Sequence, residues 1–227
     1  MTSGSVPKIF SAARRAARQS RAETLGRQPN AARWLLDEMR TDLAERIAFM
    51  RLEPSRRLDL ECDEEHPIPG GPYDLITSIA RLDTVNDLPG ALLHIRNALA
   101  PGGLMIAQII GASSLPMLRK IMLAADEDRP AARIHPQVDN RAATALLERA
   151  GFARQVVDGA ALKASYRSLD QLIADLREQG LNSVLLSPAP YVGKAGLARA
   201  HAAFDALKDS ESRVTETFEI LTLTGWR

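Results

Sequence analysis

Apolar side chains recur at helical spacing in the first quarter of the chain. Between residues 30 and 51 they return every three or four positions, which predicts an amphipathic helix with one buried face. Pro54 ends this element because proline cannot continue a helix. The segment 8–24 is also predicted to be helical, and no strand-like run occurs before residue 57. The apolar stripe of the stronger helix consists of Leu36, Met39, Leu43, Ile47 and Met50.

From residue 57 onward, short apolar runs of strand length alternate with amphipathic helical segments. The predicted strands are 57–62, 73–80, 103–110, 152–157 and 217–226. The predicted helices are 86–99, 114–125, 140–150, 168–178 and 196–208. Two successive strands joined by a helix form a crossover, which implies that they run parallel.

This pattern predicts an α/β protein with a small, mostly parallel sheet and a late strand that returns into it. We expect an N-terminal helical segment over 1–56. An α/β domain should follow over 57–227, with a helical insertion at about 160–210 that forms a lobe.

Composition excludes several classes of protein. The chain has 227 residues, and its formal net charge of +1 gives no general attraction to nucleic acid. No apolar run reaches the roughly 20 residues of a membrane span. The single cysteine, Cys62, allows no internal disulfide, which fits a reducing compartment. The basic face of segment 8–24 is typical of a solvated helix and also of a mitochondrial transit peptide, with the cytoplasm as the default location. Its arginines are Arg14, Arg18 and Arg21.

No motif identifies catalytic residues. The sequence contains neither a G-x-G-x-x-G nor a Walker pattern, and no G-x-S-x-G nucleophile elbow. The four histidines lack ligand spacing, so no metal site is predicted. Cys62 follows a strand, where it is either a buried small residue or a ligand contact.

Two polar clusters follow predicted strands, where open α/β sheets bind ligands. The first is acidic, and the alternative is a solvated turn. The second contains Asp83, Asn86 and Asp87, of which Asn86 or Asp87 can instead cap the helix 86–99. The acidic cluster consists of Asp59, Glu61, Asp63, Glu64 and Glu65.

The segment that starts at Asp63 and reads D-E-E, Y-D-L, V-N-D-L-P and A-L-x-P-G-G resembles the second half of class I S-adenosylmethionine-dependent methyltransferases. Together with L-L-x-R-A-G-F at 146–152 and the ending T-F-E-I-L-T-L-T-G-W, it is similar to one branch of that family. The branch contains the arginine hydroxylase of complex I assembly, which is methyltransferase-like, and its bacterial relatives. The resemblance extends from about residue 8 to the end.

The chain also departs from this pattern. In the family a strand reading L-D-L-G-C-G-x-G supplies a glycine loop for the cofactor, whereas here Leu58-Asp59-Leu60 is followed by Glu61. The loop that contacts adenine in the family follows at once, at Asp63. We therefore expect a Rossmann-like sheet shortened by about two strands and two helices. A second departure is Leu82-Asp83-Thr84, where this branch commonly has a His-Trp pair.

The resemblance implies S-adenosylmethionine as cofactor, and two functions follow. The first is a methyltransferase or related hydroxylase acting on a protein or small-molecule substrate. The second is an inactive remnant that serves as a binding or assembly factor without cofactor. A homodimer or protein partner is expected to cover the shortened sheet edge. The residues that the resemblance places around the cofactor are Asp59, Asp63, Glu64, Ser78, Leu82 and Asp83.

Overall fold

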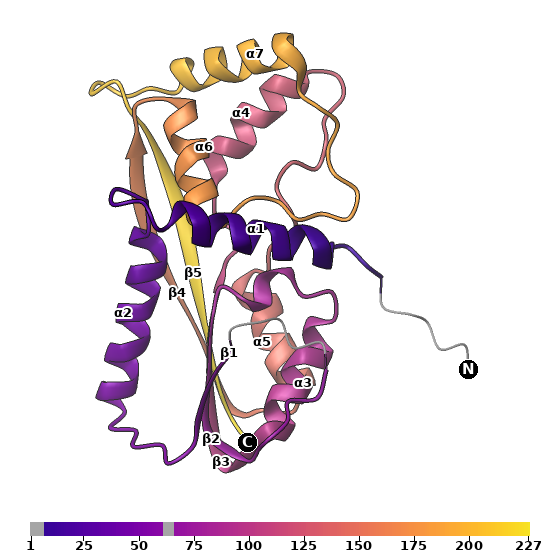
Figure 1. The fold of residues 1–227 in the computed structure, drawn as a ribbon, viewed down its shortest axis with the longest axis vertical. Coiled ribbons are helices and arrows are strands. Elements are labelled where there is room, and N and C mark those ends of the chain that lie inside the picture. Colours follow the sequence, from indigo (N-terminus) through magenta and orange to yellow (C-terminus); the bar gives the residue numbers. More distant parts are fainter. Residues whose placement is uncertain (1–6, 61–65) are drawn as a thin grey trace.

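The computed structural model describes residues 7–60 and 66–227, which form a five-stranded sheet with helices on both faces (Figure 1). The strands are β1 (Arg57–Leu60), β2 (Tyr73–Ile79), β3 (Leu99–Ile110), β4 (Ala153–Tyr166) and β5 (Val214–Trp226). The α-helices are α1 (Ala12–Leu25), α2 (Trp34–Phe49), α3 (Leu88–Ala98), α4 (Pro116–Asp126), α5 (Asn140–Arg149), α6 (Leu169–Glu178) and α7 (Gly193–Ala206), and a short 3-10 helix, η1, spans Leu82–Thr84.

The strand order β1-β2-β3-β5-β4 confirms the predicted mostly parallel sheet with a late returning strand. β1 pairs parallel with β2, and β2 pairs parallel with β3 across the crossover helix α3. β5 runs antiparallel between β3 and β4, so four of the five strands point the same way. Among the described residues, β1 has a neighbouring strand on one side only, so it forms an edge of the sheet.

Two apolar layers sandwich the sheet. On one face α3 and α5 pack against side chains such as Ile76, Met105 and Leu223. On the other face α2 packs against Leu75, Leu104 and Ile106. The alternation of Leu104, Met105 and Ile106 between the two layers is the strand periodicity expected for a sheet that is covered on both faces.

The predicted stripe of α2 is correct in part. Met39 and Leu43 are buried, but Leu35, which the stripe omits, is fully buried as well. Leu36 instead lines a cleft described below. The helix meets two neighbours, the sheet and the α6 region, and its buried face is therefore wider than a single stripe.

Two strands are longer than their patterns indicate. β4 continues to Tyr166, and β3 begins at Leu99, before the Pro-Gly-Gly segment that we expected to break the chain. The β2–β3 register shifts in this region, between the Tyr73 and Leu75 pairs. Gly102 has a φ of +76°, a conformation that glycine adopts without a steric penalty. The segment is therefore an irregularity within the strand and does not end it.

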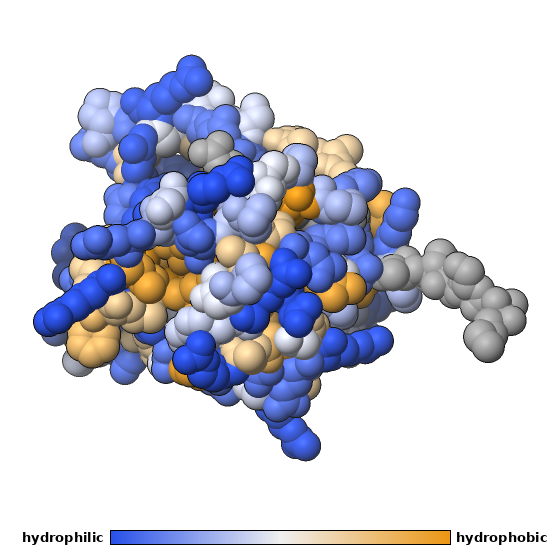
Figure 2. Space-filling model, turned by 90° about the horizontal axis from the view of Figure 1, so that it is seen from below, coloured by the Kyte–Doolittle hydropathy of each residue, from blue (hydrophilic) through white to orange (hydrophobic). Residues whose placement is uncertain are grey.

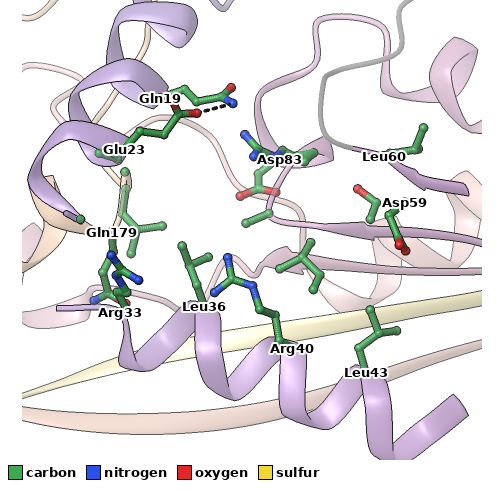
Figure 3. Close-up of a pocket in the computed structure, with 18 of the residues that line it drawn as sticks. Gln19, Glu23, Arg33, Leu36, Arg40, Leu43, Asp59, Leu60, Asp83 and Gln179 are labelled. Atoms are coloured by element: carbon green, nitrogen blue, oxygen red, sulfur yellow. Dashed lines mark hydrogen bonds between the residues drawn. The ribbon is translucent and has the colours of Figure 1, made fainter. Parts of the chain in front are cut away.

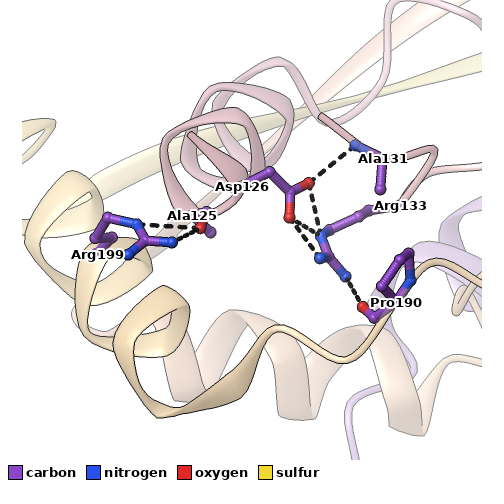
Figure 4. Close-up of polar contacts among 6 residues, drawn as sticks. All are labelled: Ala125, Asp126, Ala131, Arg133, Pro190 and Arg199. Atoms are coloured by element: carbon purple, nitrogen blue, oxygen red, sulfur yellow. Dashed lines mark hydrogen bonds and ion pairs between the residues drawn. The ribbon is translucent and has the colours of Figure 1, made fainter. Parts of the chain in front are cut away.

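A lobe of α4, α6 and α7 lies beyond the carboxyl ends of the parallel strands (Figure 1). Its connections are held by buried polar contacts (Figure 4). Asp126 forms an ion pair with Arg133 and accepts from the Ala131 N–H at 3.1 Å. Arg133 also donates to the Pro190 carbonyl at 2.9 Å, while Arg199 donates to the Ala125 carbonyl at 2.6 Å. These bonds tie two loops and α7 to the end of α4.

The face of the molecule viewed from below is mostly hydrophilic, with apolar side chains in small groups (Figure 2). Among the residues that the structure describes, no helix is long and apolar enough to cross a membrane. The domain boundaries at 56 and 57, and the homodimer or partner at the sheet edge, stay predictions.

The backbone at Gly102 provides a test of local strain. An added Cβ would meet no atom within 4 Å, so Gly102→Ala should destabilise through its positive φ alone, by about 1 kcal/mol. Chemical denaturation measures this loss. The matched control is Gly159→Ala in β4, where a Cβ would make ordinary contact with Leu221 at 3.5 Å. An equal loss in both variants would contradict the assignment of strain to Gly102.

The Asp126 ion pair should make stability depend on pH. The bonds from Arg133 lower the pKa of Asp126, so its contribution is present above the carboxyl's ordinary pKa and is lost as the pH falls through the lowered value. Asp126→Asn should therefore cost about 2 kcal/mol near neutral pH, and the cost should shrink in acid. Urea denaturation over a pH series measures it, with the exposed Asp128→Asn as control. A cost that does not vary with pH would count against this role.

Candidate functional site

A cleft of about 850 Å³ lies between α1, α2 and the carboxyl ends of β1 and β2 (Figure 3). The strand ends contribute Asp59, Leu60, Ser78 and Ile79, and the turn that follows β2 contributes residues 80, 81, 83 and 84. Its position at the ends of parallel strands is where open α/β sheets bind ligands. The size falls within the range of small-molecule sites.

The roof of the cleft, α1, is held at its start by backbone bonds. Asn86 Oδ1 accepts from the N–H groups of Ile9 and Phe10, each at 2.8 Å. Ser11 N–H donates to the Val184 carbonyl at 2.9 Å. Asn86 was one of two predicted caps of the helix after β2, but Asp87 performs that role by accepting from Gly90 N–H at 2.9 Å. Asn86 is thus available to anchor the segment before α1.

The inner side of α1 is polar. The helix has no buried residue, and its cleft-facing positions include Arg15, Arg18 and Gln19. Arg18 donates to the Asn182 carbonyl at 3.1 Å, and Arg15 donates to the Thr84 carbonyl. Of the three arginines predicted to form the basic face, only Arg18 lines the cleft; Arg14 and Arg21 are exposed and lie outside its lining.

The floor of the cleft, α2, is positioned by α6. Glu178 accepts from Ala32 N–H at 2.7 Å, and Gln179 accepts from Leu35 N–H at 2.9 Å. These side chains satisfy backbone donors at the start of α2 that have no partner within the helix. Asp175 accepts from Trp34 Nε1 at 3.1 Å and from the Tyr166 hydroxyl. Burial and the Asp175 carboxylate raise the pKa of Tyr166, which keeps this donor protonated.

The structure brings together three of the predicted cofactor residues. Asp59, Ser78 and Asp83 all line the cleft. Leu82 is buried in the core beneath it and is not part of the lining. Asp63 and Glu64 lie outside the described residues, as do Glu61, Glu65 and Cys62.

The three lining residues differ in their partners. Asp59 forms an ion pair with Arg57 at 2.8 Å and accepts from the Thr77 hydroxyl. Ser78 is only 3% exposed, and its Oγ has no hydrogen-bond partner among the described residues. Asp83 Oδ1 is likewise buried without a partner there. Burial raises the pKa of Asp83 to about 6, although the nearby positive charges of Arg18 and Arg81 oppose this shift.

Arginine dominates the charge of the cleft, which the sequence patterns did not predict. Among the described residues, the lining holds four carboxylates, Glu23, Asp59, Asp83 and Glu178, against seven arginines. Arg15 and Arg18 lie three residues apart on α1, and Arg33 and Arg40 lie seven residues apart at the start of α2 and along it, so the members of each pair share a helix face. Only the tertiary packing brings these two faces to the same cleft. The seven are Arg15, Arg18, Arg27, Arg33, Arg40, Arg57 and Arg81.

Outside the cleft, His135 is the other buried titratable group without a complete set of partners. Its Nδ1 has no hydrogen-bond partner in the described chain, and its ring meets Phe10 edge-on at 5.7 Å. Burial lowers its pKa to about 4, so it is neutral at physiological pH. Within residues 7–60 and 66–227, no three His, Cys, Asp or Glu side chains are grouped to hold a metal ion.

Comparison with known proteins connects this chain to methyltransferases. At 28% identity, 82% of the chain aligns with 56% of the mitochondrial arginine-hydroxylase NDUFAF5 of Rattus norvegicus. At 26% identity, 70% of it aligns with 54% of the malonyl-[acyl-carrier protein] O-methyltransferase of Xylella fastidiosa. The chain thus spans about half the length of these relatives.

Among solved structures, the YcgJ protein of Bacillus subtilis has a TM-score of 0.43 at 10% identity, over 71% of this chain and 67% of that one. The model of the methyltransferase domain family matches residues 19–156, which is more than half of the chain. This match contains the second half of α1, all of α2, the strands β1, β2 and β3, and most of the residues that line the cleft. The chain therefore belongs to the methyltransferase domain family, as a methyltransferase-like α/β protein.

Proposed function

We propose that this member of the methyltransferase family is a binding protein that does not hold S-adenosylmethionine in the manner of the family. The observation that carries the proposal is the arginine-rich cleft beside an edge strand. The proposal corresponds to the second of the two functions that the resemblance implied, a non-catalytic binding or assembly factor.

The sheet lacks one wall of the family's cofactor site. In the pattern that this chain resembles, the strand next to β1 ends in an acidic residue that binds the ribose hydroxyls. Here β1 is an edge strand, and no described strand lies on its outer side. The nearest acidic side chain on β1, Asp59, is already engaged by Arg57 and Thr77. The described residues therefore do not fit the ribose end of the cofactor.

The charge of the cleft also opposes the cofactor. S-adenosylmethionine carries a positive sulfonium, and a cation placed among arginines is repelled unless carboxylates compensate. Of the lining carboxylates, Glu178 caps α2 and Asp59 is paired with Arg57. Asp83 lies within the electrostatic reach of both Arg18 and Arg81. Counted over the described residues, the lining has more arginines than carboxylates.

The competing function is a diverged methyltransferase or hydroxylase. Family membership favours it, and so does the position of Asp59, Ser78 and Asp83 at one cleft. Methyl transfer depends mainly on positioning and requires few catalytic side chains. The two functions therefore differ first in whether the cofactor binds.

Calorimetric titration with S-adenosylmethionine separates the two functions. We expect no saturable heat and no rise in melting temperature up to about 1 mM ligand, because neither the ribose nor the sulfonium finds a partner. A ligand at 100 times its dissociation constant would add about 2.7 kcal/mol of stability, which thermal denaturation detects easily. A conventional methyltransferase of the family is the positive control.

One result would overturn the proposal. Saturable binding that Asp59→Asn abolishes, while the exposed Asp128→Asn does not, would place the cofactor at the end of β1 and favour an enzyme. Light scattering after size exclusion would test the separate prediction of a homodimer, since a monomer at high concentration excludes it.

A further inference from the structure

Among the described residues that line the cleft, seven arginines outnumber four carboxylates. Glu23 accepts from Gln19 at 3.0 Å, Glu178 caps the start of α2, and Asp59 pairs with Arg57. The neutral donors to Glu23 and Glu178 leave the charges of these carboxylates in place, so four negative charges face seven positive ones in the described lining. Guanidinium groups gathered at this density are typical of sites that bind carboxylate or phosphate.

One group of positive charges lies at the inner end of the cleft. Arg18 and Arg81 are close enough that each influences the ionisation of Asp83, and Arg81 also lowers the pKa of Arg18. Burial is the largest cause of the lowered pKa of Arg18. Among the described residues, the hydrogen-bond acceptors of Arg18 are neutral, namely the Asn182 carbonyl and the Thr84 hydroxyl at 3.4 Å. An anion bound beside Arg18 and Arg81 would attract both guanidinium groups, which otherwise repel each other.

A second group lies at the outer end, where α1 ends and α2 begins. Arg27 and Arg33 line this end, and no described carboxylate lies within ion-pair distance of either. Arg40 lies further along α2, and Figure 3 shows it facing Asp83 across the cleft, so it does not belong to this outer group. Arg40 is already paired with Asp37 at 2.6 Å. The free charge at this end is therefore that of Arg27 and Arg33.

Ser78 provides an independent sign of a ligand. The residue is only 3% exposed and lines the cleft, and its hydroxyl has no hydrogen-bond partner in the described chain. Buried hydroxyl groups are nearly always hydrogen-bonded, so an unpaired one at the end of a parallel strand indicates a group that binds there.

The lining also limits the kind of ligand. Of the described residues that form it, none is aromatic, so a nucleobase would find no ring on which to stack. A volume of about 850 Å³ suits a small molecule. The two arginine groups lie at different ends, which favours a ligand with two separate acidic groups.

We propose that this cleft binds a small polyanion, with one acidic group at Arg18, Arg81 and Ser78 and another at Arg27 and Arg33. Phosphate and carboxylate groups share the geometry that a guanidinium recognises. The inference deepens the proposed function by naming the ligand class of the same cleft.

Calorimetric titration with two probes tests whether the cleft binds a polyanion and whether it prefers phosphate or carboxylate groups. Sodium pyrophosphate represents phosphates and citrate represents carboxylates, each measured at about 150 mM salt so that weak surface attraction is screened. We expect at least one probe to bind with a sub-millimolar dissociation constant. Arg81→Gln and Arg33→Gln should each weaken binding about tenfold, because each removes a charge-assisted hydrogen bond.

The matched control is Arg141→Gln, an exposed arginine on α5 that lies outside the cleft and should leave affinity unchanged. Arg33 is exposed as well, so its variant tests binding even if Arg81→Gln lowers stability. Ser78→Ala should weaken binding severalfold. The inference is overturned if neither probe binds at about 10 mM, or if Arg141→Gln weakens binding as much as Arg33→Gln.

Titration with S-adenosylmethionine under the same conditions keeps the two proposals distinguishable. If neither polyanion nor cofactor binds, this inference fails while the proposed non-catalytic role stands. If the cofactor binds and a polyanion still depends on Arg33 and Arg81, the proposed function fails and the polyanion site stands.

Discussion

Antiparallel pairing of β5 with both β3 and β4 joins the two parts of this molecule. β5 pairs with β3 from Leu104 opposite Trp226 onward, and with β4 as far as Tyr166 opposite Val214. The parallel strands and the helical lobe would otherwise share little backbone bonding. Because β4 leads directly into α6, this pairing also sets where α6 lies. α6 in turn caps the start of α2, and the segment after it holds α1, so both helical walls of the cleft depend on β5.

The cleft itself is built by polar bonds more than by apolar packing. α1 buries no residue of its own, and Asn86 and the backbone near Val184 hold its beginning. A helix attached in this way can direct arginines toward the sheet, because no apolar stripe has to occupy that side. The arrangement explains why arginines gather near the strand ends among the described residues, in a protein whose net charge is only +1.

The shortened sheet gives this family member its distinctive site. Only residues 61–72 separate β1 from β2, so the chain passes from one strand to its parallel neighbour without a crossover helix in the described part. β1 becomes an edge, and the helices α1 and α2 line the space beside it. Family membership describes the fold, whereas the ligand depends on the side chains that now face this space.

The sequence alone determined the elements, their order and the fold class, because these depend on local patterns. Short stretches of chain were enough to predict the βαβ crossover and the late returning strand. They also gave Asp87 as one of two possible caps of α3. The lengths of β3 and β4 were not, because strand pairing extends elements beyond their own propensity. Asp59 and Asp83 were predicted near a ligand from their places at strand ends and Ser78 from the family resemblance, and the structure gathers all three at one cleft. Only the tertiary structure decided the character of that cleft, since Arg18, Arg33 and Arg81 come from three segments that only packing brings together.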